Sequence, residues 1–312
     1  HTNKQFKRAE LEEIIKKYDI KLIGPNVLGI INPYKNFNAS FFKEMPEKGK
    51  VGILSQSGAV GTSLLDKALE ENLGISSFIS LGNMIGEDFI SALEYLEQDL
   101  YTEVLVLYVE SLREKTGRKF IDLCRRISRK KKILAIKAGK TREGERAAKT
   151  HTASLSSSSE IYSGAFKQAG ITEAESLNEL FKLAQIFSKF KGIGKKACII
   201  TNAGGLGVLA VDACIKAGAE LPEIPAKILS ELDSFLPSGY SRSNPLDILG
   251  DALAERYEKV LKILARQDLF DFFIVILSPQ EMTQPLETAR VLAKTGKPIF
   301  ACLIGGESFI EA

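Results

Sequence analysis

Apolar positions follow two alternating spacings over most of this chain. From residue 50 onward, short apolar runs such as KVGILSQ and TEVLVLYVES alternate with segments such as GAVGTSLLDKALEENLG, in which apolar side chains recur every three or four positions. The short runs predict buried strands, and the longer spacing predicts amphipathic helices. Strands that alternate with helices in this way predict a parallel sheet with right-handed helical crossovers.

The alternation is interrupted at the basic, glycine-containing segment KGIGKK and restarts with ACIITNAGGLGVLAV. We therefore predict two doubly wound α/β domains, at residues 45–190 and 195–312. The second ends on a strand where another helix is expected, so we expect it to be truncated at its C-terminus. Residues 1–44 offer a helix over RAELEEIIKKY, a strand over DIKLIG and the turn-rich GPNVLGIINPYKN. We interpret them as the last piece of a domain whose front is missing.

The composition is that of an ordinary globular protein and disfavours several function classes. The 312 residues carry 42 Lys and Arg against 39 Asp and Glu, a balance that gives no case for nucleic-acid binding. The four cysteines include no C-x-x-C pair, so we expect buried free thiols and no zinc site. Since no apolar stretch approaches a membrane span and no signal peptide is recognisable, a cytoplasmic protein is predicted.

Both predicted domains begin with a strand that turns into a helix through small residues, ILSQSGAVGTSLL and IITNAGGLGVLAV. The first backbone N–H groups of a helix lack internal partners and carry partial positive charge, so such a turn can bind a phosphate. The candidate phosphate-binding residues are Ser55, Gln56, Ser57, Gly58, Thr201, Asn202, Ala203, Gly204 and Gly205.

A single glycine-rich turn of this kind is as typical of close packing as of binding, and serines there also cap helices. Neither turn matches G-x-G-x-x-G with an acidic ribose partner, and neither has the lysine of a Walker P-loop. Two such turns without a nucleotide fingerprint favour bare phosphate, or a phosphoryl group carried on something else.

His151 is the one histidine of the chain besides His1, and it lies in EGERAAKTHTASLSSSSE. Its small polar neighbours disfavour a packed core histidine, which leaves an idle surface residue or a reactive one. A reactive imidazole fits the two turns, because neutral imidazole is a nucleophile and its phosphoramidate retains a high transfer potential. A carboxylate is then needed on the other ring nitrogen, and the pattern alone does not choose Glu110 over Glu87 or Asp88.

Segments spread along nearly the whole chain are similar, in the same order, to one family: IGPNVLGIINP, GKVGILSQSGAVG, SLGNM, YVES, KAGKTREGERAAKTHTASLS, TNAGGLGV and NPLDILGDA. They resemble the NDP-forming acyl-CoA synthetases, of the type of the alpha subunit of ADP-forming acetyl-CoA synthetase, which is related to succinyl-CoA synthetase. The element KTHTAS around His151 is the most specific part of this resemblance.

The resemblance implies a reaction and a role for each candidate. Acyl-CoA and phosphate give acyl phosphate and CoA, the acyl phosphate phosphorylates the histidine, and phosphohistidine converts ADP to ATP. On this basis His151 is the phosphocarrier and Glu110 the carboxylate that holds it. The turns Ser55–Gly58 and Thr201–Gly205 flank the phosphate, and Asn26 lies at the edge of the CoA thioester site.

The resemblance also implies domains, cofactors and partners. Two flavodoxin-like domains, the first like succinyl-CoA ligase and carrying the phosphohistidine loop, follow the tail of a truncated Rossmann-like CoA-binding domain at residues 1–44. The cofactors are CoA, phosphate and ADP/ATP with Mg²⁺. An ATP-grasp beta subunit or fused domain would bind the nucleotide, in a hetero-oligomer or a homodimer. No metal site is expected in this chain.

Two departures and one alternative stay open. Most of a CoA-binding domain and all of an ATP-grasp domain are absent from the sequence, and serines replace some glycines expected after His151. A second hypothesis is a non-catalytic ligand-sensing module, as found fused to protein acetyltransferases, in which the histidine would have no task. Asp247 and Asp251 in SNPLDILGD are helix caps on the plain interpretation, or secondary elements of the site.

Overall fold

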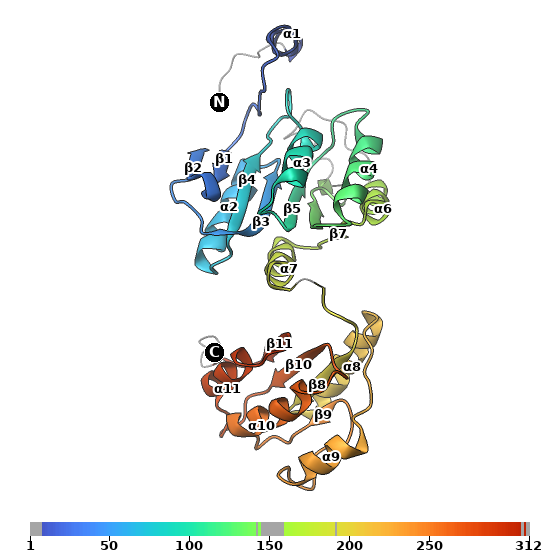
Figure 1. Ribbon diagram of the computed structural model, residues 1–312. Helices are drawn as coiled ribbons and strands as arrows, with labels where there is room; N and C mark the ends of the chain where they lie inside the picture. The colour runs from blue at the N-terminus through green and yellow to red at the C-terminus, as the bar shows by residue number, and fades with distance from the viewer. Residues whose placement is uncertain (1–7, 142, 145–158, 191, 307–308, 310–312) are drawn as a thin grey trace. The chain divides into compact units, whose positions relative to one another are not determined.

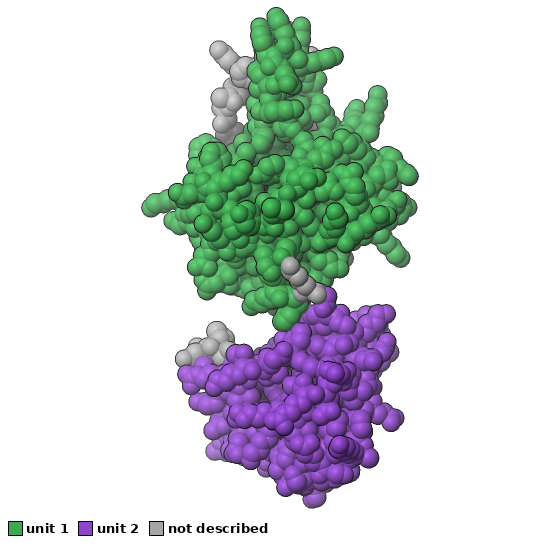
Figure 2. Space-filling view, viewed as in Figure 1, with its two compact units in different colours: residues 1–191 green, residues 192–312 purple. Residues whose placement is uncertain are grey.

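The computed structural model describes residues 8–141, 143–144, 159–190, 192–306 and 309. The chain divides into two compact units, residues 1–191 and residues 192–312 (Figures 1 and 2). We describe each unit by itself.

Unit 1 is built on a seven-stranded sheet of order β2-β1-β4-β3-β5-β6-β7. Five of these strands are parallel and follow one another with helical crossovers: β3 (Lys48–Ser55), β4 (Ile75–Ser80), β5 (Val104–Val109), β6 (Lys132–Lys137) and β7 (Thr172–Glu173). Their spatial order, second-first-third-fourth-fifth, is that of a flavodoxin-like doubly wound sheet. The alternating pattern of the sequence therefore predicted this part of the fold correctly.

An antiparallel hairpin widens this sheet at the β4 edge. It consists of β1 (Gly29–Asn32), the 3₁₀ turn η1 (Pro33–Lys35) and β2 (Phe37–Ser40), and β1 pairs with β4. The prediction of a strand over DIKLIG, residues 19–24, was wrong. Gly24 and Asn26 both have positive φ, which breaks an extended run there. Strand β1 lies instead in the segment interpreted as a turn, and β2 follows directly after that segment.

Helices cover both faces of the unit 1 sheet (Figure 1). One face carries α2 (Gly58–Glu70) and α7 (Leu177–Lys189), whose apolar side chains pack on those of β3, β4 and β5. The other face carries α3 (Phe89–Gln98), α4 (Gly117–Ile127) and α6 (Ser159–Ala169). Helix α1 (Arg8–Tyr18) precedes the loop that leads into the hairpin.

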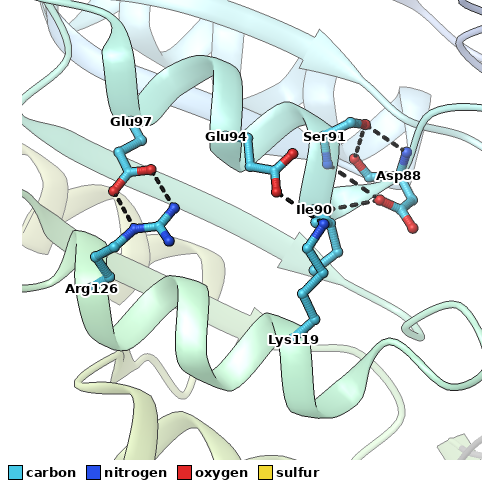
Figure 3. A network of polar contacts seen from close by, with 7 residues as sticks. All are labelled: Asp88, Ile90, Ser91, Glu94, Glu97, Lys119 and Arg126. Atoms are coloured by element: carbon cyan, nitrogen blue, oxygen red, sulfur yellow. Dashed lines mark hydrogen bonds and ion pairs between the residues drawn. The ribbon is translucent and has the colours of Figure 1, made fainter.

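Polar contacts fix the start of α3 and join it to α4 (Figure 3). Asp88 and Ser91 form a reciprocal capping box, in which the Asp88 carboxylate accepts from Ile90 N at 2.8 Å. Arg126 donates two hydrogen bonds of 2.7 Å to Glu97, and Lys119 pairs with Glu94. Because these pairs lie at the surface, we expect them to orient the helices more than to stabilise them.

Unit 2 has a four-stranded parallel sheet of order β11-β10-β8-β9, which is the same winding as the first four parallel strands of unit 1. The strands are β8 (Ala197–Thr201), β9 (Leu246–Asp247), β10 (Phe272–Leu277) and β11 (Ile299–Leu303). Helices α9 (Ala226–Asp233), α10 (Ala254–Ala265) and α11 (Pro285–Ala293) share the larger core on one face. Helix α8 (Gly204–Lys216) packs on the other face through a smaller cluster.

Two predictions from composition have different outcomes. Cys124, Cys198 and Cys214 are buried free thiols as expected, and burial raises the pKa of each, whereas Cys302 is exposed near the end of β11. The prediction of four buried thiols was therefore wrong at Cys302. Within the described residues, no helix is long and apolar enough to cross a membrane.

Candidate functional site

The turn between β3 and α2 is fixed by its own side chains. Ser55 is fully buried and its Oγ donates to Ser57 O at 2.7 Å. Ser57 is the N-cap of α2, where its Oγ accepts from Val60 N at 3.3 Å. The N–H groups of the first helical residues, which begin at Gly58, have no intrahelical acceptor. The turn therefore presents a preformed and partly positive helix N-terminus at the carboxyl edge of the sheet.

The two glycines of this turn serve different ends. A Cβ on Gly61 would lie 2.6 Å from the Phe78 ring, so a glycine is needed for α2 to pack closely on β4. A Cβ on Gly58 would make only ordinary contacts with Leu28, at 3.6 Å or more. Close packing therefore accounts for Gly61, whereas the packing around Gly58 would tolerate a Cβ.

The turn between β8 and α8 repeats this design with one change. Thr201 is fully buried, and its Oγ1 donates to Ala203 O at 3.0 Å and accepts from Ala203 N at 2.9 Å. The N-cap position is Ala203, which gives α8 no side-chain cap. A Cβ on Gly204 would lie 2.7 Å from Asp247 Oδ2, so a carboxylate lies beside this helix N-terminus.

Beside each turn, a buried side-chain amide bridges two neighbouring strands of the sheet, a feature that the sequence analysis missed. Gln56 Oε1 accepts from Glu110 N at 2.8 Å and from Ser111 N at 3.0 Å. In unit 2, Asn202 Oδ1 accepts from Ser278 N at 2.8 Å and its Nδ2 donates to Ser278 O. Both amides join the first strand to the third, at the point where the strand order reverses and doubly wound folds place their ligands.

Glu110 directly follows β5, and Gln56 fixes its backbone. Burial, and then the charge of Glu110, raises the pKa of the neighbouring Tyr108. The two alternative carboxylates have other tasks: Asp88 caps α3, and Glu87 lies 3.8 Å from Lys21 Nζ. Of the three carboxylates, Glu110 is the one placed directly after β5, at the carboxyl edge of the sheet. His151 lies outside the described residues.

Asn26 lies in a loop bound against the carboxyl edge of the unit 1 sheet. Asn83 N donates to Pro25 O at 3.0 Å, and Leu28 N donates to Ser80 Oγ at 2.9 Å. A Cβ on Gly82 would lie 2.5 Å from Asn26 O, which explains a glycine at that position. Since Leu28 also contacts Gly58, the loop brings Asn26 to the same edge as the N-terminus of α2.

The two aspartates of SNPLDILGD have local structural partners. Asp247 Oδ1 accepts from Leu249 N at 2.9 Å, and Asp251 pairs with Arg256. The hydrogen bond from Arg256 lowers the pKa of Asp251. Among the described residues, no group of three or more His, Cys, Asp or Glu side chains could hold a metal ion.

The fold and these edges together define a doubly wound α/β protein with a small-residue turn and an amide bridge at each switch point. Two family models match it: the succinyl-CoA ligase like flavodoxin domain over residues 48–187, and the Ligase-CoA domain over residues 197–305. These matches cover the parallel strands of both units, whereas the β1–β2 hairpin lies before the first match.

Named relatives agree with the two models. The chain is 40% identical to acetate–CoA ligase [ADP-forming] I of Archaeoglobus fulgidus, over 97% of this chain and 44% of that protein. It is 38% identical to the alpha subunit of acetate–CoA ligase [ADP-forming] II of Pyrococcus furiosus, over 98% of this chain and 68% of that subunit.

A solved structure extends the similarity to three dimensions. It is the acetyl-coenzyme A synthetase 1 of Candidatus Korarchaeum cryptofilum, described as dinucleotide forming and bound to phosphate and ADP. Its TM-score is 0.90 at 33% identity, over 97% of this chain and 67% of that one. The chain therefore belongs to the family of ADP-forming acetate–CoA ligases, which are acid–thiol ligases, as its resemblance predicted. It spans less than half the length of the first of these relatives.

Proposed function

We propose that this chain is the alpha-type region of an ADP-forming acyl-CoA synthetase and carries the phosphohistidine of the reaction at His151. The relatives reported above are all named as ligases or synthetases, which does not favour the alternative of a ligand-sensing module. The observation that carries the proposal is the paired design of the two turns. Each places the N-terminus of a long helix beside the switch point of its own sheet.

The proposed reaction divides one difficult exchange into three transfers. Phosphate displaces CoA from acyl-CoA to give acyl phosphate. A nitrogen of His151 attacks the phosphorus of the acyl phosphate, and the acid leaves. ADP then takes the phosphoryl group to form ATP and frees the imidazole. Because phosphoryl transfer depends mainly on positioning and charge stabilisation, helix N-termini can assist it without a covalent role.

The residues of this chain divide these tasks. The N-termini of α2 and α8 stabilise phosphoryl oxygens, each at its own stage of the cycle. Glu110 accepts from the second ring nitrogen of His151 and fixes its tautomer. Gln56 acts as a positioning residue, since it holds the backbone of Glu110. Asn26 contributes to the edge of the thioester site from the loop bound beside Gly82.

We assign the remaining cofactors and partners from the same proposal. Residues 1–44 correspond to the end of a CoA-binding domain, residues 45–190 to the phosphohistidine domain and residues 195–312 to the second ligase domain. An ATP-grasp domain, on a beta subunit or fused, supplies the site for ADP/ATP and Mg²⁺.

Phosphorylation by acetyl phosphate tests the proposal directly. We expect intact mass under neutral conditions to show one added phosphoryl group, which acid treatment removes. His151→Asn should abolish the addition, whereas His1→Asn, the matched change at the other histidine, should retain it. If neither this chain nor the full-length protein with its partner acquires a phosphoryl group on His151, the proposed function is wrong.

A further inference from the structure

A cavity of about 420 Å³ lies in unit 1 between α3 and the β1–β2 hairpin. It exists because the hairpin extends the sheet past the strands on which α3 packs. Its apolar walls come from the hairpin, from β4, from α3 and from the loops beside them: Ile23, Ile30, Phe37, Ile79, Leu81 and Ala92. The volume is in the range of small-molecule sites in proteins.

Two buried polar side chains line this cavity with unused hydrogen-bonding capacity. Ser77 is 1% exposed, and its Oγ forms no hydrogen bond with any described residue. Asn32 is 7% exposed; its Oδ1 accepts from Lys35 N at 3.0 Å, while its Nδ2 donates to none of the residues in the described ranges. Polar groups buried in this way are normally paired, so their orientation toward a cavity points to a polar ligand atom.

Three charged side chains lie at or beside the cavity, and two of them are lysines. Lys35 is exposed at its rim and forms no ion pair within the described part of the chain. The one carboxylate of the lining, Glu87, lies 3.8 Å from Lys21 Nζ. Among the residues that line it, the cavity therefore combines apolar walls with one lysine that has no ion-pair partner in the described ranges and with two buried neutral donors, the amide of Asn32 and the hydroxyl of Ser77.

We propose that this cavity is a binding site for a small amphipathic carboxylic acid. Its hydrocarbon body lies against Ile30, Ile79 and Ala92, and its carboxylate accepts hydrogen bonds from Ser77 Oγ, Asn32 Nδ2 and Lys35 Nζ. An apolar side chain docked from another protein would leave Ser77 and Asn32 unpaired, which is unfavourable for buried polar groups. The proposal does not depend on phosphoryl transfer at His151.

Calorimetric titration with hexanoate tests this site, with hexylamine as the probe of equal length and opposite charge. We expect saturable binding of one hexanoate per chain and none of hexylamine. Lys35→Met should weaken hexanoate at least roughly 10-fold, the effect of losing a charged hydrogen bond. Lys43→Met, at an exposed lysine outside the lining, is the matched control and should bind like the parent.

Two further variants keep the test decisive. Ala92→Phe should fill the cavity and abolish binding, and Ser77→Ala, which removes one oxygen atom, should weaken binding while the thermal unfolding curve is retained. Absence of saturable hexanoate binding to the parent chain would overturn the proposal. So would equal binding of hexylamine, or binding that Lys35→Met and Ser77→Ala leave unchanged.

Discussion

The two units use the same strand–turn–helix but place it in different surroundings. In unit 1, Ser57 caps α2, and α7 packs beside α2 on the same face of the sheet. In unit 2, α8 has no side-chain cap, Asp247 lies beside its first turn, and Val208, Leu209 and Ile215 are exposed on its outer side. The shared turn therefore gives each unit a helix N-terminus where an anion can bind. The side chains around that N-terminus, such as Ser57 in unit 1 and Asp247 in unit 2, make the charge environment of the two turns different.

The largest difference between the two units should appear in the rate of phosphorylation, when the residue after the third parallel strand of each sheet is replaced. Glu110 follows β5, and Ser278 holds the matching place after β10. If Glu110 orients the imidazole, Glu110→Gln should slow phosphorylation of His151 by acetyl phosphate roughly 100-fold or more. Ser278→Ala should change the initial rate, followed by intact mass, less than about 3-fold. A Glu110→Gln protein that is phosphorylated at the parent rate would contradict the assigned role.

Replacing the buried amide of either unit should destabilise the protein to a similar extent. Gln56→Leu removes the acceptor of two backbone N–H groups, and Asn202→Leu removes both partners of Ser278. We expect each variant to lose about 2–4 kcal/mol of unfolding free energy, because each leaves two backbone polar groups, buried or half-buried, without their partner. Urea unfolding measures the loss, and amide hydrogen exchange shows which unit is affected. An effect below about 1 kcal/mol in both would mean that water replaces the amides.

The parallel strands and their helices could be predicted because each buried strand is a short apolar run and each helix has a clear apolar face. The β1–β2 hairpin could not be predicted in this way. Its strands have four residues each, and GIIN reads as part of a turn because Gly24 and Asn26 break the chain just before it. Its pairing with β4 is a tertiary contact, which local spacing does not encode.

The candidate site also has a part that could be predicted from the sequence and a part that could not. The turns were found from their small residues, since that signal is local. The bridge from Gln56 to Glu110 spans 54 residues and depends on β3 and β5 being neighbours, so sequence reasoning without the strand order could not give it. An amide after the first strand in both ILSQS and IITNA was the available signal.

Two glycine substitutions, one in each unit, should differ in their packing cost. A Cβ on Gly61 would lie 2.6 Å from the buried Phe78 ring, whereas one on Gly207 would lie 3.1 Å from Thr201 Cγ2. Gly61→Ala should therefore destabilise unit 1 by about 1–3 kcal/mol through overpacking. At Gly207 the better helix propensity of alanine offsets the tighter contact, so Gly207→Ala should stay within about 1 kcal/mol of the parent. Urea titration compares them, and equal losses would contradict the packing argument.

The smallest effects concern one surface ion pair in each unit, Glu97–Arg126 and Asp251–Arg256. The hydrogen bonds from arginine lower the pKa of both carboxyl groups. A lowered pKa in the folded state adds stability above the unfolded pKa, and this stability is lost as pH falls through the folded value.

Glu97→Gln and Asp251→Asn should therefore lower Tm at neutral pH. They should leave Tm unchanged well below the ordinary carboxyl pKa values, 4.5 for glutamate and 3.8 for aspartate. Glu97 should show the larger shift, because its side chain is 18% exposed and that of Asp251 is 57% exposed. Solvent screens exposed pairs more strongly. Thermal unfolding of both variants across this pH range measures the difference, and a Tm gap that widens on acidification would reverse the sign and contradict the pairing.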